Sequence, residues 1–344
     1  IDKKLVIEGN TGDSLQSFTN SSDIEIDDEG NFYIFDQRLQ KVFKYGRDGK
    51  FLLSFCGRGT GPAEIDGAQD IAIAGDSITI CSPGAAKGSI FDKNGNFGYH
   101  STIFIPGLYY GVVDKGIGDD DILGYNPTFN TDDNQVLIGN EFVIKNKKYE
   151  KKIVLHTIPA DRDPKDIEGA KIIFMPFAHY KDNIYYAPNF PESYNINVKD
   201  RNGNLKSIIS KHAARIEYNP EEKKHYEEAS SFSWNGEKII PNCRLKSVLN
   251  GIYTDKYGHL LVWVSQKRKE GVKHIPSIDV FKDGEFQNTI NLEEVKIVES
   301  HTPTDVTFNF TNDKLVVFDI NDNIYSIYDY HYENMKGINE TIGN

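Results

Sequence analysis

Short apolar runs follow one another along the chain, and polar turns separate them. Residues 27–36 read DDEGNFYIFD and residues 255–264 read DKYGHLLVWV, so the same Asp-x-x-Gly turn twice enters an apolar and aromatic segment. Weaker copies stand at residues 181–186 and 312–317. Gly or Asn supplies the positive φ that a tight hairpin turn needs. The pattern therefore predicts β-strands joined by short hairpins.

A second phrase consists of a strand, an Asp/Asn-Gly turn and another strand. It begins at Val42, Ile90, Val198 and Val280. Because the second phrase follows the first after about one strand length, one repeat unit reads as a four-stranded meander. A single meander cannot bury both of its faces, whereas meanders arranged radially bury them against one another. The sequence therefore predicts a β-propeller.

The number of blades follows from the number of innermost strands. The sequence predicts these strands near residues 23–26, 70–73, 110–113, 175–178, 248–252 and 306–309. We therefore expect six four-stranded antiparallel blades in a single domain spanning residues 1–344. The last unit lacks an outer strand of its own, so we expect the strand-like residues 3–7 to pair with it and close the ring.

Two regions depart from the repeat. Residues 115–135 are polar and weakly periodic, which predicts a long loop on the third blade. Residues 219–230 carry Asn219 as a helix cap, Pro220 at the first helical position and acidic residues in the first turn, which predicts a short helical insertion.

The repeat units resemble a known class of propeller. Residues 23–65 and the segment GIYTDKYGHLLVWV look like NHL-type repeats, and the Gly-rich connection at residues 57–62 is NHL-like as well. The whole chain resembles the six-bladed propellers related to the TolB-like group, which occur as secreted or lipid-anchored proteins of Bacteroidetes. The resemblance implies a compartment outside the cytoplasm of a bacterium, either secreted, periplasmic or anchored to the cell envelope.

The net charge and the cysteine content narrow the class of protein further. The net charge of −12 opposes binding to nucleic acid and to anionic membranes. No segment approaches the roughly 20 apolar residues that span a bilayer, so we expect no membrane insertion by this chain. Because the chain starts at Ile1, a leader, a lipid anchor or a tag upstream all remain open. The cysteines at 56, 81 and 243 lack metal-ligand spacing, which favours buried thiols, while one disulfide stays open.

Propellers commonly bind ligands at the mouth of the central channel, on strand ends and on the loops that join blades. The polar residues expected there form a candidate ligand-binding set: Asp23, Arg58, Asp70, Tyr109, Tyr110, His179, Arg244 and Asp305. The same residues would also suit strand capping and hydration of the channel. The sequence predicts no cofactor, although Asp23, Asp70, Asn250 and Asp305 would supply oxygen ligands of the kind that calcium prefers.

Two functions follow from these observations. The favoured one is a non-enzymatic binding propeller that takes a peptide, a protein or a glycan on one face. This preference rests on the repeat scaffold, its many aromatic residues and the lack of a recognisable catalytic motif. The alternative is an enzyme of the channel mouth, a hydrolase or lyase acting on a lactone or sugar acid with a divalent cation. Three carboxylates, Asp23, Asp70 and Asp305, would hold that cation.

Overall fold

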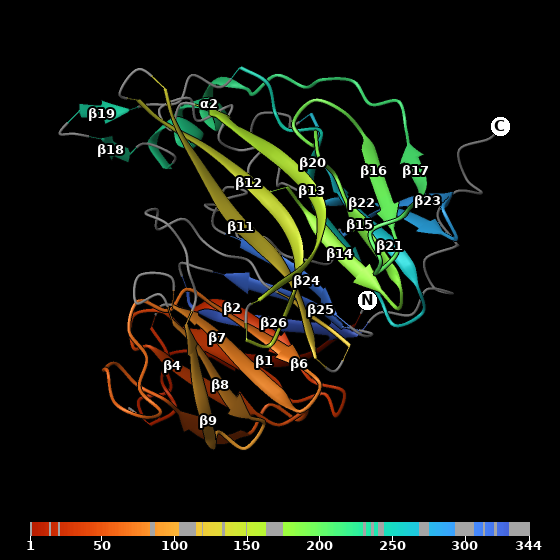
Figure 1. The fold of residues 1–344 in the computed structure, drawn as a ribbon. Coiled ribbons are helices and arrows are strands. Elements are labelled where there is room, and N and C mark those ends of the chain that lie inside the picture. Colours follow the sequence, from red (N-terminus) through yellow and green to blue (C-terminus); the bar gives the residue numbers. More distant parts are fainter. Residues whose placement is uncertain are drawn as a thin grey trace. The chain divides into compact units, whose positions relative to one another are not determined.

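The computed structural model describes residues 2–13, 15–19, 21–82, 87–102, 115–118, 120–132, 135–148, 150–162, 175–229, 232–234, 237–239, 244–267, 275–292, 306–311, 314–319 and 322–329. The described residues form six four-stranded antiparallel sheets, one two-stranded hairpin and a single described helix (Figure 1). This is the six-bladed all-β propeller class that the repeat predicts. No helix in the described part of the chain is long and apolar enough to cross a membrane.

The chain divides into two compact units, and the first three blades lie within one of them. This unit comprises residues 5–161 and 320–325. Blade one contains β2 (Ser21–Ile26), β3 (Phe32–Asp36), β4 (Lys41–Tyr45) and β5 (Phe51–Phe55). Blade two contains β6 (Asp70–Ala74), β7 (Ser77–Ser82), β8 (Lys87–Asp92) and β9 (Phe97–Thr102). Blade three contains β10 (Lys115–Ile117), β11 (Asp121–Asp132), β12 (Gln135–Asn146) and β13 (Lys151–Arg162).

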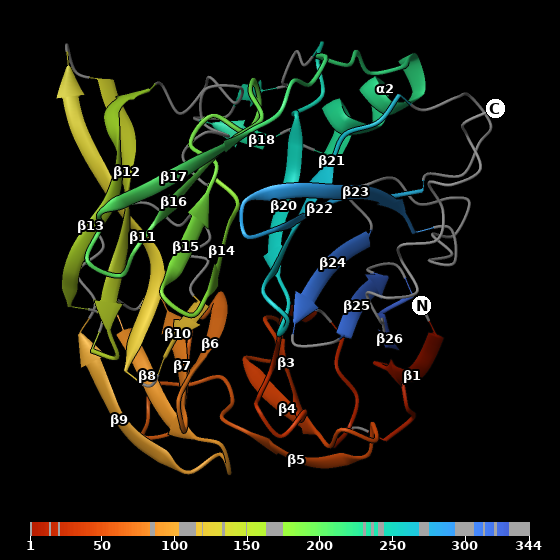
Figure 2. The same cartoon turned by 90° about the vertical axis from the view of Figure 1, so that its right-hand side faces the viewer.

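The other unit, residues 1–4, 162–319 and 326–344, holds the next two blades (Figure 2). Blade four contains β14 (Phe177–Tyr180), β15 (Asn183–Tyr186), β16 (Asn195–Lys199) and β17 (Leu205–Ser210). Blade five contains β20 (Leu249–Thr254), β21 (His259–Val264), β22 (Ser277–Lys282) and β23 (Glu285–Asn291). Between these blades lie the helix α2 (Pro220–Ala229) and the hairpin of β18 (Phe232–Trp234) and β19 (Glu237–Ile239).

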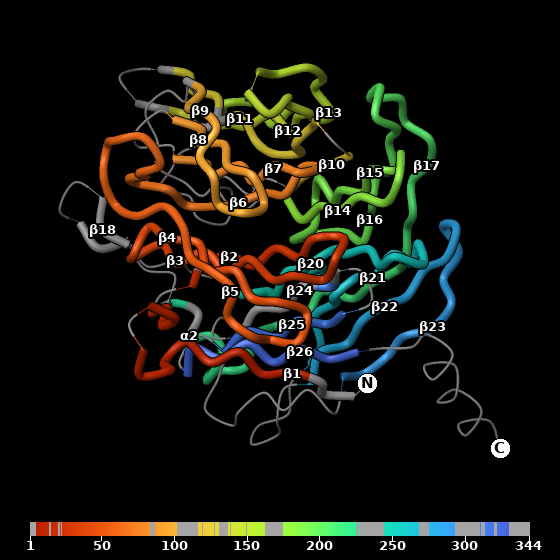
Figure 3. Tube along the Cα trace, turned by 90° about the horizontal axis from the view of Figure 1, so that it is seen from below, coloured from red at the N-terminus to blue at the C-terminus, as the bar shows by residue number. Residues whose placement is uncertain are grey.

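The sixth blade combines the two ends of the chain. It contains β24 (Val306–Thr311), β25 (Lys314–Asp319), β26 (Ile324–Asp329) and the N-terminal β1 (Asp2–Glu8). The strand order is β1-β26-β25-β24, and Figure 3 shows the four strands in this order. The predicted pairing of the N-terminal strand with the last unit is therefore confirmed.

The hairpin turns repeat one set of side-chain contacts. In DDEGN at 27–31, Asp27 Oδ1 accepts hydrogen bonds from the backbone N–H of Glu29 and of Asn31, while Asp27 Oδ2 accepts one from Asn31 Nδ2. The turns at residues 92–96, 200–204 and 255–259 repeat this arrangement. The Asp side chain thus satisfies donors that the reversing backbone would leave unpaired.

Apolar side chains of neighbouring blades share a core within each unit. Phe35 and Val42 of blade one pack in one buried cluster with Ile71, Ile80 and other side chains of blade two. In the other unit, Leu261 and Val280 of blade five pack in a cluster with residues of blade six. Central strands such as β3 are buried on both faces, so they appear in the sequence as continuous apolar runs.

The third blade corrects one prediction. Residues 115–135 were predicted as a loop, but this range contains β10, β11 and the first residue of β12. A ladder joins Asp121 to Asn146 at one end and Asp132 to Gln135 at the other. The innermost strand is residues 115–117, whereas the predicted innermost strand at 110–113 lies outside the described residues. Asn, Asp, Gly and Pro have low strand propensity, but backbone pairing of β11 along the twelve-residue β12 overrides it.

The predicted helix is confirmed as α2. Asn219 Oδ1 accepts a hydrogen bond from the Glu222 N–H at 2.9 Å, and Glu222 Oε2 accepts one from the Asn219 N–H at 3.1 Å. This reciprocal pair is a capping box, which satisfies two donors that a helix start leaves open. Pro220 occupies the first helical position, as expected.

Candidate functional site

Two of the predicted site residues, Asp23 and Asp70, meet at one backbone amide. The N–H of Ile71 donates to Asp23 Oδ2 at 3.3 Å and to Asp70 Oδ1 at 3.0 Å. Asp23 Oδ1 also accepts a hydrogen bond from the Ile24 N–H at 2.8 Å. The two carboxylates therefore lie close together at the start of β2 and β6, and both also cap strands, as the alternative interpretation expected.

Three further predicted residues, Arg58, Arg244 and His179, make other contacts. Arg58 is exposed and donates from Nη2 to the backbone oxygen of Arg38 at 3.1 Å. Arg244 forms an exposed ion pair with Glu217 at 2.6 Å. His179 lies in β14, where its backbone oxygen accepts a hydrogen bond from Thr254 Oγ1 at 2.5 Å. Tyr109, Tyr110 and Asp305 lie outside the described residues.

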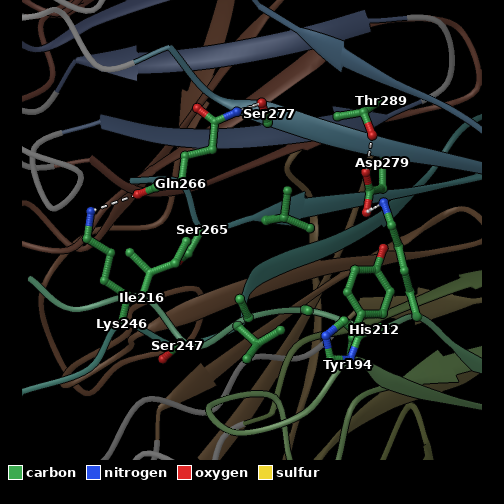
Figure 4. Close-up of a pocket in the computed structure, with 15 residues that line it drawn as sticks. Tyr194, His212, Ile216, Lys246, Ser247, Ser265, Gln266, Ser277, Asp279 and Thr289 are labelled. Carbon is green, nitrogen blue, oxygen red and sulfur yellow. Dashed lines mark hydrogen bonds and ion pairs between the residues drawn. The ribbon is translucent and has the colours of Figure 1, made fainter. Parts of the chain in front are cut away.

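A pocket of about 270 Å³ lies between blades four and five, and none of the predicted site residues lines it. It lies at the ends of the strands opposite the turns that hold Gly203, Gly258 and Gly284. Its hydroxyl and amide side chains belong to Tyr194, Ser247, Ser265, Gln266, Ser277 and Thr289 (Figure 4). Many of the lining residues come from the connection between β17 and β20 and from the loop between β21 and β22.

An ion pair between Lys211 and Asp279 forms one wall of the pocket. Lys211 Nζ donates to Asp279 Oδ2 at 2.8 Å, and Thr289 Oγ1 donates to Asp279 Oδ1 at 2.5 Å. Asp279 is almost completely buried, whereas 36% of the Lys211 side chain is exposed. The ammonium group also lies 4.1 Å from the centre of the Phe286 ring, a distance at which a cation and an aromatic face attract. Both oxygens of this buried carboxylate are therefore already hydrogen-bonded.

The hydroxyl of Tyr194 points toward Asp279 in the same wall (Figure 4). Burial, then the negative charge of Asp279 and a side-chain hydrogen bond to it, raise the pKa of Tyr194, so the hydroxyl keeps its proton. This hydrogen bond is poorly aligned, and both Asp279 oxygens already accept from Lys211 and Thr289. A buried O–H with a poorly aligned acceptor gains from a better-placed one.

Lys246 stabilises the opposite rim of the pocket. Its Nζ donates to Glu222 Oε1 at 2.6 Å and to the backbone oxygen of Gln266 at 2.9 Å. Since Glu222 belongs to the capping box of α2, this buried pair ties the helix to the start of β20 and to the end of β21. The rim is completed by Gln266, whose Nε2 donates to Ser277 Oγ.

The remaining lining of the pocket is apolar except for the exposed imidazole of His212. The apolar residues are Ala213, Ala214, Ile216, Val248 and Val264. Val248 is buried in the core shared by blades four and five, and Ala213 and Val264 pack against this core. The pocket therefore joins an apolar strip to a wall of hydroxyls and paired charges, a combination that small-molecule sites share.

Cysteine thiols and metal-ligating side chains are the other candidate groups for chemistry. Neither Cys56 nor Cys81 forms a disulfide, and Cys243 lies outside the described residues. Burial raises the pKa of Cys56 to about 12, which keeps the thiol protonated and unreactive. Within the described ranges, no group of three or more His, Cys, Asp and Glu side chains is arranged to hold a metal ion.

Sequence reasoning missed the pocket because its residues stand at unremarkable places in the repeat. One signal was available in the segment SIDVFKDG, where Asp279 stands between two residues of a buried strand. A charged residue at such a position needs a buried partner. The sequence does not identify the partner, because Lys211 lies on the preceding blade.

Comparison with known proteins shows likeness in fold alone. No family model matches the sequence, and no curated protein matches it. A crystal structure of a DUF4221 family member from Bacteroides vulgatus is similar at a TM-score of 0.55 and 11% identity, over 96% of this chain and 98% of that one. The structure described as a putative exported protein from Bacteroides fragilis is similar at a TM-score of 0.50 and 9% identity, over 96% and 97%.

Proposed function

We propose that this protein is a non-enzymatic binding propeller outside the cytoplasm, which takes a peptide, a protein or a glycan into the pocket between blades four and five. The single observation that carries the proposal is the combination of an apolar strip, a hydroxyl-rich wall and a buried, poorly aligned donor at Tyr194 in one cavity. The carboxylate of Asp279 accepts hydrogen bonds at both oxygens, so it holds Lys211 in place more readily than it removes a proton from a ligand. The neighbour described as exported supports the compartment.

The test uses two probe libraries and one matched pair of variants. Purified protein is applied to a glycan array and to a phage-displayed library of random peptides. Ala214→Trp places an indole into the pocket from an exposed position, and Arg215→Trp places the same group on the exposed neighbour outside the lining. We expect at least one ligand class to bind the wild type and Arg215→Trp, and to lose affinity for Ala214→Trp. The proposal is wrong if no probe binds, or if Ala214→Trp binds equally well.

A second candidate function keeps the divalent-cation enzyme acting on a lactone or sugar acid. The observation that favours it is the proximity of the Asp23 and Asp70 carboxylates at the Ile71 amide. Any ligand that binds only the folded state raises the thermal midpoint. A rise with calcium that a chelator abolishes, and that the double variant Asp23→Asn/Asp70→Asn lacks, would favour the enzyme. An unchanged midpoint would favour the binding function.

A further inference from the structure

The charges in the pocket are compensated, which bears on the kind of ligand that fits. Each lysine in the lining is paired with a carboxylate, Lys211 with Asp279 at 2.8 Å and Lys246 with Glu222 at 2.6 Å. The wall that faces the ligand therefore carries no net charge from these four groups. An acidic ligand would gain little attraction there and would approach the buried Asp279 carboxylate. This arrangement favours a neutral ligand.

The polar groups of the lining both donate and accept hydrogen bonds. Ser247, Ser265 and Thr289 carry hydroxyls, Gln266 carries an amide, and the Tyr194 hydroxyl is a buried donor without a well-aligned acceptor. Lys211 Nζ donates one hydrogen bond to Asp279 and has two further N–H groups. A ligand that matches such a wall needs closely spaced groups that donate and accept at the same atom. Adjacent sugar hydroxyls have this property.

The size and shape of the cavity narrow the choice of ligand further. The cavity of about 270 Å³ is slightly smaller than the roughly 300–1,000 Å³ that small-molecule sites span, so one ring-sized group fills it. The strip of Ala213, Val248 and Val264 offers an apolar surface to the C–H groups of a ring. A peptide backbone carries its donors and acceptors along an extended line, which requires a longer groove.

We infer that the pocket between blades four and five binds a single neutral sugar residue of a glycan, with the Tyr194 hydroxyl and Lys211 Nζ donating hydrogen bonds to its hydroxyl groups. This inference rests on the proposed binding function and names its ligand class. Asp279 and Thr289 hold Lys211 in place, and the apolar strip contacts the ring.

Binding of simple sugars to the intact protein tests the inference. The probes are the methyl glycosides of glucose, galactose and mannose, N-acetylglucosamine, and the charged glucuronic and galacturonic acids. Isothermal titration and saturation-transfer NMR report binding. We expect a neutral probe to bind with an affinity that salt between 50 and 300 mM leaves unchanged, since screening acts on charged ligands.

Tyr194→Phe is the informative variant because it removes the hydroxyl and keeps the ring. Loss of one ligand hydrogen bond should weaken the neutral probe about tenfold. A purely structural role for the hydroxyl would leave the affinity unchanged. Tyr45→Phe is the matched control: the Tyr45 hydroxyl donates to the Gln16 backbone oxygen, so its loss should not affect sugar binding.

Each remaining outcome separates the inference from the proposed function. If only peptides bind, and Ala214→Trp abolishes their binding, the binding function stands and the sugar inference is wrong. Tighter binding of an acidic sugar than of every neutral one also overturns the inference. If neither sugars, glycans nor peptides bind, both the inference and the proposed function fail.

Discussion

The ammonium group of Lys246 lies 2.6 Å from Oε1 of Glu222, and both side chains are more than nine-tenths buried. The pair joins the first turn of α2 to the start of β20 and, through the Gln266 backbone oxygen, to the end of β21. Arg244 and Glu217, in the same connection, also lie 2.6 Å apart, but both of these side chains are exposed. The two ion pairs have the same length in different surroundings, so they separate the effect of burial from that of distance.

Lys246→Met should destabilise the protein strongly. The substitution leaves the Glu222 carboxylate buried without its cation, which costs about 3–5 kcal/mol of unfolding free energy. Arg244→Met should cost less than about 1 kcal/mol, because water screens its exposed pair. Urea unfolding of both variants measures the difference, and equal urea midpoints would contradict this account. Adding Glu222→Gln to Lys246→Met should restore part of the lost stability.

The turn at residues 92–96 should stabilise the fold at neutral pH and lose this contribution at low pH. The hydrogen bond from the Asn96 side chain is the largest cause that lowers the pKa of Asp92. The folded state therefore binds the proton less readily than the unfolded chain. This stabilisation is fully present above the ordinary Asp pKa of about 3.9 and is lost as the pH falls through the lowered value. The difference in unfolding free energy between the wild type and Asp92→Asn should thus shrink from pH 6 to pH 3.

Asn96→Ala provides the control for this pH effect, because it removes the largest cause of the shift and keeps the carboxylate. Its pH dependence should fall between those of the wild type and Asp92→Asn. Parallel stability curves for all three proteins between pH 3 and pH 6 would show that the turn makes no contribution.

Gly116 should tolerate no larger side chain. A Cβ atom there would overlap the backbone oxygen of Ile73, where β10 packs against β6. The backbone cannot rotate away as a side chain would, so Gly116→Ala should cost about 3 kcal/mol or more. At Gly57, nothing lies within 4 Å of the corresponding position, and Gly57→Ala should change stability by less than about 1 kcal/mol. Thermal unfolding compares the two variants, and similar midpoints would count against close packing of β10 on β6.

Cys56 should resist alkylation in the native protein. Burial raises the pKa of its thiol to about 12, so almost none of it is thiolate at pH 8.5. We expect iodoacetamide to modify Cys56 only after unfolding in urea, as measured by mass spectrometry of tryptic peptides. Buried Cys81 serves as an internal reference. Native modification of Cys56 at the rate seen in urea would mean that the thiol is accessible and ionised.

Local sequence signals account for most of the fold. The Asp-x-x-Gly phrases at Asp27 and Asp255 predict their turns because the Asp side chain bonds to backbone groups two and four residues ahead. Asn219 and Glu222 identify the helix start for the same reason, since both partners lie within one helical turn. The prediction was wrong at residues 115–135, where strand pairing decides the structure and local composition points to a loop.

The candidate site was much less accessible from the sequence. Asp23 and Asp70 were predicted as polar strand ends, and the structure shows that they share the Ile71 amide. The pocket between blades four and five was not predicted. Tyr194, Lys211 and Asp279 do not belong to a recurring phrase, and no spacing rule relates them.

The sequence by itself determined the repeated meander, the turn chemistry, the helix start and the use of the N-terminal strand in the last blade. These features depend on contacts between near neighbours in the chain or on a repeat that is visible in the residues. Only the tertiary structure decided which charged groups face each other and where a cavity remains. Lys211 and Asp279 are 68 positions apart, and they meet because blades four and five share a core. Packing between blades fixes that distance, and no local pattern records it.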